Sequence, residues 1–116
     1  DYWKALDVAV YRNYEDFLDR NPNAVIYMAT TKAKQCYTGV HYEPDCYLMF
    51  GKESAGIPEE LLVANQKNCI RIPMMGEFRS LNLSNSAAIV LYEALRQGGF
   101  KHMNRQGELH RLRWEE

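Results

Sequence analysis

Residues Ile70–Gln97 read IRIPMMGEFRSLNLSNSAAIVLYEALRQ and combine a strand, a loop and a helix in close succession. The apolar residues Ile70 to Ile72 predict a short strand, which Pro73 stops. From Ser84 onward, apolar residues recur at helical spacing, and Gly98-Gly99 supplies the stop signal. The first turns of this helix consist of small residues, which let a ligand or another backbone segment approach the helix start. An ordinary amphipathic helix with a serine or asparagine cap is the simpler interpretation.

Three other segments have the pattern of strands. The apolar run Ala24–Ala29 is typical of a strand buried on both faces, and Cys46–Phe50 predicts a second buried strand. Residues 1–11 end in an apolar alternation that fits one more short strand, formed by Leu6, Val8 and Val10.

Two shorter helices are predicted between these strands. Residues 13–20 form the first, with Asn13 as its cap and with Phe17 and Leu18 facing inward. The second runs from Pro58 to about Asn65, because a proline and two carboxylates favour a helix start. Since strands alternate with helices, we expect an α/β domain with a parallel sheet.

The composition of the chain excludes several classes of protein. The 116 residues carry 14 Lys+Arg against 15 Asp+Glu, so the overall charge does not indicate nucleic-acid binding. Cys36, Cys46 and Cys69 have neither metal nor redox spacing and are interpreted as buried or incidental thiols in a reducing cytosol. The histidines are scattered too, so no metal site is expected. No apolar run approaches the roughly 20 residues of a membrane span.

A ligand site is expected where the predicted strands end. In open α/β sheets, ligands bind beyond the carboxyl ends of the strands. Here these ends are Ala29–Thr31, Phe50–Glu53 and Ile72–Met74. Gly51 and Gly56 allow close backbone approach, but their spacing matches no dinucleotide or triphosphate motif. Glu53 is either a general base or a side chain that holds its own loop, and the structural role is favoured because the glycines around it need fixing.

Two motifs carry a resemblance to a known family. FGKESAGIP at Phe50–Pro58 and the Ile70–Gln97 segment together resemble the second and third motifs of the SPOUT methyltransferases. Within that superfamily, the chain resembles the small tRNA 2′-O-methyltransferases that modify the wobble nucleotide of leucine tRNAs. The similarity runs over residues 1–100 and leaves a polar tail over 101–116. It implies a SPOUT-type fold with a C-terminal trefoil knot, through which the helix Ser84–Gln97 is tucked.

The resemblance also implies S-adenosylmethionine as the cofactor, bound in a bent shape within the knot. The residues that it assigns to the cofactor lie at the strand ends and in the segment before the long helix. They are Ala29, Gly51, Glu53, Gly56, Ile72, Met74, Ser80, Leu81 and Asn82.

The candidates for catalysis are fewer. Members of the family open with a further strand–loop–helix section, whose arginine is thought to help activate the attacking hydroxyl. Nothing in this sequence corresponds to that section, so the chain is expected to represent the family without its opening segment. A ribose 2′-hydroxyl is a poor nucleophile and needs help in losing its proton. Glu53, Ser84 and Asn85 are the remaining candidates for that role.

The implied function is 2′-O-methylation of the wobble cytidine or uridine of a tRNA in the cytoplasm. A ribosomal-RNA 2′-O-methyltransferase and a non-catalytic, dimeric RNA-binding module with the same fold are the alternatives. Lys32 and Lys34 are predicted to contact RNA, because their loop emerges on the rim of the cofactor site. The resemblance further implies a homodimer, with Tyr92 either at the contact or packed in the monomer core. The charges of the tail are interpreted as solvated.

Overall fold

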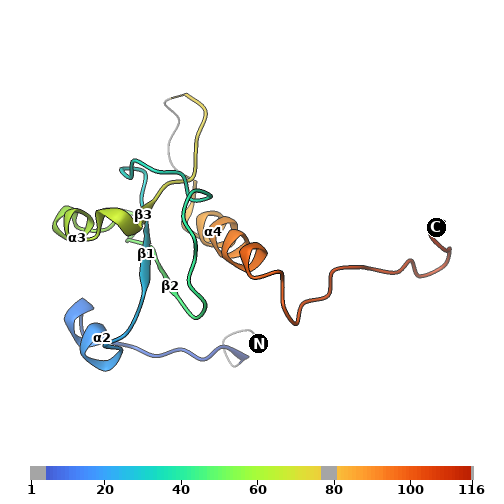
Figure 1. Ribbon diagram of the computed structural model, residues 1–116, viewed down its shortest axis with the longest axis horizontal. Helices are drawn as coiled ribbons and strands as arrows, with labels where there is room; N and C mark the ends of the chain where they lie inside the picture. The colour runs from blue at the N-terminus through green and yellow to red at the C-terminus, as the bar shows by residue number, and fades with distance from the viewer. Residues whose placement is uncertain (1–4, 77–80, 116) are drawn as a thin grey trace.

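The computed structural model describes residues 5–76 and 81–115, which form a three-stranded parallel sheet with helices on both faces (Figure 1). The strands β1 (Ile26–Ala29), β2 (Tyr47–Met49) and β3 (Cys69–Ile70) lie in the order β2-β1-β3. The helices are α2 (Tyr14–Arg20), α3 (Glu59–Ala64) and α4 (Leu83–Gln97), and the 3-10 helix η1 (Gln66–Asn68) leads into β3. The predicted α/β class with a parallel sheet is confirmed.

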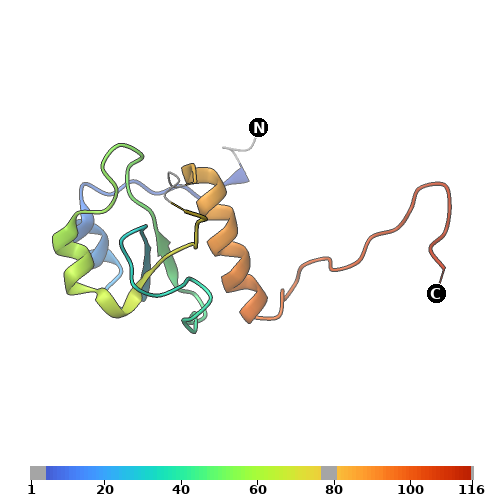
Figure 2. The same cartoon turned by 90° about the horizontal axis from the view of Figure 1, so that it is seen from above.

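The central strand, β1, contributes side chains to two separate apolar clusters. Ile26 and Met28 pack in the cluster that α2 and α3 cover. Tyr27 points to the opposite face, where it packs with Ile70 and with Val90 of α4. This alternation is the period of two that a strand imposes on its side chains. The sheet is therefore sandwiched, with α2 and α3 on one face and α4 on the other (Figure 2).

Asparagine caps begin two of the helices. The side-chain oxygen of Asn13 accepts a hydrogen bond from the Asp16 N–H at 2.8 Å, as the sequence predicted. Asn82 accepts from the Asn85 N–H at 2.9 Å, so α4 starts one residue earlier than expected. Such a cap typically stabilises a helix by about 1 kcal/mol, because it satisfies an N–H group that the helix leaves unpaired. Gly98 ends α4, as the sequence predicted.

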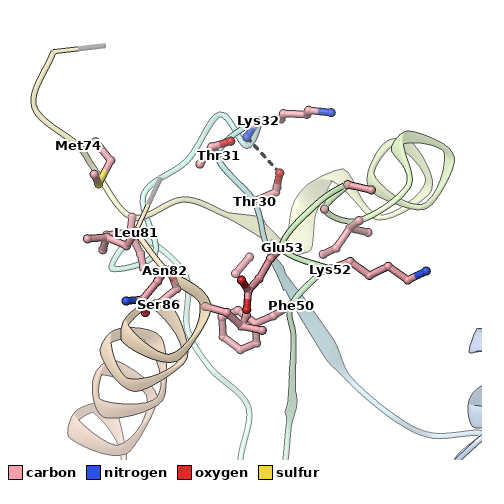
Figure 3. Close-up of a pocket in the computed structure, with 17 residues that line it drawn as sticks. Thr30, Thr31, Lys32, Phe50, Lys52, Glu53, Met74, Leu81, Asn82 and Ser86 are labelled. Atoms are coloured by element: carbon pink, nitrogen blue, oxygen red, sulfur yellow. Dashed lines mark hydrogen bonds between the residues drawn. The ribbon is translucent and has the colours of Figure 1, made fainter. Parts of the chain in front are cut away.

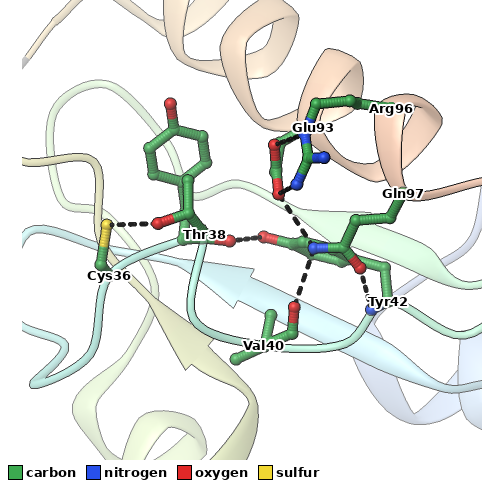
Figure 4. Close-up of polar contacts among 8 residues, drawn as sticks. Cys36, Thr38, Val40, Tyr42, Glu93, Arg96 and Gln97 are labelled. Atoms are coloured by element: carbon green, nitrogen blue, oxygen red, sulfur yellow. Dashed lines mark hydrogen bonds and ion pairs between the residues drawn. The ribbon is translucent and has the colours of Figure 1, made fainter.

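A polar clamp, formed by Glu93, Arg96, Gln97, Val40 and Tyr42, ties α4 to the loop before β2 (Figure 4). Gln97 donates to the Val40 carbonyl and accepts from the Tyr42 N–H, both at 2.9 Å. The buried Glu93 accepts two hydrogen bonds from Arg96, at 2.8 and 2.9 Å, and one from Gln97 at 2.9 Å. These donors, Arg96 before Gln97, lower the pKa of Glu93. The clamp therefore fixes the C-terminal half of α4 against the sheet.

The strand predicted within residues 1–11 is wrong for the described part of that segment. Residues 7–11 adopt no strand, and Val10 is 91% exposed. Leu6 and Val8 are exposed as well. Residues 7–11 pair with none of the three strands, so the apolar alternation alone did not produce a ladder.

The three strands are shorter than the apolar runs that predicted them. The strand expected over Ile70–Ile72 ends at Ile70, because the Arg71 backbone pairs with another segment. The Arg71 N–H donates to the Gln35 carbonyl at 3.0 Å, and the Arg71 carbonyl accepts from the Tyr37 N–H at 2.8 Å. β2 lies at the edge of the sheet and is not fully buried, so Tyr47 is 41% exposed.

Candidate functional site

A cavity of about 530 Å³ lies where the carboxyl ends of the strands meet the start of α4 (Figure 3). Eight of the nine residues predicted for the cofactor line it, drawn from four separate segments of the chain. They are Ala29, Gly51, Glu53, Gly56, Ile72, Met74, Leu81 and Asn82. The ninth, Ser80, lies outside the described residues. The structure thus brings these residues together, and their role in binding a cofactor stays a prediction.

One wall of the cavity is the loop over residues 51–57, which folds back on itself. The Gly56 N–H donates to the Lys52 carbonyl at 2.7 Å, and Gly56 has a φ of +70°, which favours glycine. A Cβ at Gly51 would overlap the backbone of Gly56 and Ile57, with the Gly56 Cα only 2.6 Å away. The buried Ile57 side chain anchors the end of this loop in the core. Two glycines therefore give the wall its shape.

The opposite wall is the start of α4. Asn82 and Ser86 both line the cavity, because residues four apart lie on the same face of a helix. Ser86 was not among the predicted site residues, although its spacing from Asn82 could have identified it. Ser84 and Asn85, predicted as candidates for catalysis, are exposed and do not line the cavity. Of the three candidates, the structure places only Glu53 in the cavity wall.

The rim of the cavity is fixed by polar contacts of the loop after β1. The Lys32 N–H donates to the Thr30 hydroxyl at 3.1 Å, and Arg71 donates to the Thr31 carbonyl at 2.9 Å. Lys32 Nζ lies 2.9 Å from a carboxylate oxygen of Glu59, and this hydrogen bond lowers the pKa of Glu59. Figure 3 shows Glu53 extending from the 51–57 loop toward Phe50, on the inner side of this rim.

Over residues 5–76 and 81–115, no group of three or more His, Cys, Asp or Glu side chains could hold a metal ion. In the same described ranges, no helix combines the length and apolar character needed to cross a bilayer.

Sequence comparison gives the family of the chain. The family described as SpoU rRNA methylase matches residues 1–92, which is most of the 116 residues. The chain belongs to the SpoU rRNA methylase family. The chain is 40% identical over 103 residues to the tRNA (cytidine(34)-2′-O)-methyltransferase of Escherichia coli K12, covering 86% of the present chain and 64% of that protein.

Two solved structures are similar to the chain in fold. One is described as giving structural insights into the 2-OH methylation of C/U34 on tRNA. It matches with a TM-score of 0.78 at 31% identity, and the match covers 87% of this chain and 66% of that one. The other, an AdoMet-bound rRNA methyltransferase from Sinorhizobium meliloti, matches with a TM-score of 0.62 at 30% identity, over 72% and 33%. The chain spans about three-fifths of the length of the curated relatives it matches, 61% in two of them.

Proposed function

We propose that this SpoU methylase transfers a methyl group from S-adenosylmethionine to the 2′-hydroxyl of nucleotide 34, a wobble cytidine or uridine, in a tRNA. The observation that carries the proposal is that the strand ends, the 51–57 loop and the start of α4 line one cavity together. The similarity to the Escherichia coli enzyme supports tRNA, since the chain is 40% identical to it and 30% identical to the rRNA methyltransferase.

The cavity suits a cofactor of this size and chemistry. Small-molecule sites usually occupy roughly 300–1,000 Å³ and combine apolar walls with a few polar groups. Here the volume is about 530 Å³, with Phe50, Ile72 and Leu81 as apolar walls and with Glu53 and Asn82 as polar groups. We also expect α4 to be the segment threaded through a trefoil knot, which would place its small residues against the cofactor.

When bound, S-adenosylmethionine supplies a methyl group on a positively charged sulfur, which is already a good leaving group. The protein must then align the ribose oxygen and accept its proton. Glu53 is the carboxylate in the cavity wall and is assigned the role of general base. Glu53 belongs to the folded-back 51–57 loop, and positioning of the reacting groups supplies much of the rate enhancement in group transfer.

The first prediction tests this assignment. Calorimetry is expected to show that the protein binds S-adenosylmethionine. Incubation with a tRNA transcript is expected to place a 2′-O-methyl group on nucleotide 34, which mass spectrometry of nuclease fragments detects. Glu53→Gln should lower kcat by about 10²–10⁴-fold, because the amide keeps the shape but cannot accept the proton.

The matched control substrate is the same tRNA with a 2′-deoxyribose at nucleotide 34, which must remain unmodified. Cofactor binding without any transfer to tRNA or ribosomal RNA would favour the alternative of a non-catalytic RNA-binding module. Transfer to ribosomal RNA alone would contradict the tRNA assignment.

We further propose that the protein acts in the cytoplasm as a homodimer. Leu91 and Tyr92 on α4 are 46% and 54% exposed, so Tyr92 does not pack in the monomer core. That observation removes the simpler interpretation of this tyrosine and leaves the apolar side of α4 available for a subunit contact.

A further inference from the structure

A second groove, of about 1,100 Å³, lies next to the cavity, between the loop after β1 and the segment formed by α3 and η1. It shares Thr30 and Lys32 with the cavity, so the two spaces meet at one rim. Its charged lining residues are Lys32, Lys34, Lys67 and Glu59, and we call it the lysine groove.

The charge of the lysine groove contrasts with that of the whole chain. Three lysines and one glutamate give it a net charge of +2, whereas the chain carries a net charge of −1. Glu59 neutralises Lys32 by an ion pair of 2.9 Å. In the part of the chain that the structure describes, Lys34 and Lys67 form no ion pair. Both side chains are exposed, so two positive charges are available to a ligand.

The two walls of the lysine groove are tied together near these free lysines. Gln35, the residue after Lys34, donates from its side-chain amide to the Lys67 carbonyl at 2.7 Å and to the Cys69 carbonyl at 3.0 Å. Lys34 and Lys67 therefore project from backbone segments held at a fixed separation. Such preorganisation reduces the entropy lost when a ligand engages both walls.

We propose that the lysine groove holds the phosphate backbone of the tRNA beside the nucleotide being methylated, with Lys34 and Lys67 as the phosphate contacts. The inference rests on the proposed function. Because groove and cavity meet at Thr30 and Lys32, a strand whose target nucleotide enters the cavity continues directly into the groove. Phosphate contacts of this kind fix the position of a strand without reading its sequence.

The test is the salt dependence of tRNA binding, measured by fluorescence anisotropy with a labelled anticodon stem–loop. Each lysine that neutralises a phosphate of a single strand contributes about 0.7 to the slope of log K against log salt. Lys34→Ala with Lys67→Ala should therefore reduce the slope by about 1.4 and raise KM for tRNA, with kcat and cofactor affinity unchanged. The arginine pair at the same two positions should restore the slope.

Glu59→Gln changes the charge of the lysine groove in the opposite direction to the double alanine variant. It frees Lys32 and removes the one carboxylate from the lysine groove, so tRNA should bind more tightly and the slope should steepen by about 0.7. Lys101→Ala is the matched control, because Lys101 is also exposed but lies in the tail, away from the groove.

A wild-type salt slope in the double alanine variant, or no steepening in Glu59→Gln, overturns the proposal. These outcomes are separate from a failure of the proposed function, which would appear as a wild-type protein that binds no S-adenosylmethionine or leaves nucleotide 34 unmodified.

Discussion

At the residue scale, a contact within the protein itself requires glycine at position 51. The family resemblance predicted only that the Gly51 backbone meets a cofactor. The structure adds a contact within the protein, since any Cβ at Gly51 would meet the backbone of Gly56 and Ile57. A backbone neighbour cannot move aside as a flexible side chain can, so even alanine must open the 51–57 loop.

The second prediction follows from that contact. Gly51→Ala should lower the melting temperature and weaken S-adenosylmethionine binding at least tenfold, about 1.4 kcal/mol, because the cavity loses one of its walls. Calorimetry and thermal unfolding measure the two effects. Gly107→Ala is the control, since a Cβ there meets no atom within 4 Å. Undiminished cofactor binding by Gly51→Ala would contradict the assignment of the cavity.

Residue patterns predicted the strand ends of the site well but not all of its members. Ala29 and Ile72 end apolar runs and Gly51 follows one, and parallel strands bring their carboxyl ends to one edge. Lys67 could not be linked to Lys34 in the same way, because the two are far apart in the sequence. The side-chain amide of Gln35, which joins the two walls, places them along one groove.

At the scale of the elements, the apolar runs predicted that strands exist but not where they end. Strand limits depend on the partner strand, and a single sequence does not show the partner. Arg71 illustrates this, since its backbone pairs with the 35–37 loop instead of extending the ladder with β1. Helix limits were predicted more closely, because the caps Asn13 and Asn82 act within the same turn.

The third prediction concerns α4 and its polar clamp. Hydrogen bonds from Arg96 and then Gln97 lower the pKa of Glu93, so its folded-state value lies below the unfolded value of about 4.3. The stabilisation that the charged Glu93 gives to the folded state is therefore complete above about pH 4.3. It is lost as the pH falls through the folded-state pKa of Glu93. Glu93→Gln should lower the melting temperature at neutral pH, and this difference from wild type should shrink below about pH 4.

Thermal unfolding followed by circular dichroism from about pH 7 to pH 3 measures the difference. Glu108→Gln serves as the control, because Glu108 is an exposed tail residue outside the clamp. If the melting temperature of Glu93→Gln stays below that of wild type by the same amount across this range, the charge of Glu93 does not stabilise the clamp.

At the scale of the whole molecule, the tail after α4 lies apart from the sheet and its helices. The radius of gyration is 17.2 Å, against about 13 Å for a compact domain of this length. Figures 1 and 2 show the cause, since the residues after α4 run away from the sheet and its helices. The tail therefore leaves the exposed face of α4 uncovered, which is consistent with the proposed role of that face in a subunit contact.

The last prediction tests this contact. Tyr92→Arg places a charge on the exposed apolar side of α4, so a dimer formed there should dissociate, because a buried, unpaired charge costs several kcal/mol. Light scattering at micromolar concentration should give a dimer mass for wild type and a monomer mass for the variant. Leu112→Arg introduces the same charge at an equally exposed apolar residue of the tail and should remain dimeric. A wild-type protein that methylates tRNA as a stable monomer would rule the dimer out, and a dimeric Tyr92→Arg would place the subunit contact away from this face of α4.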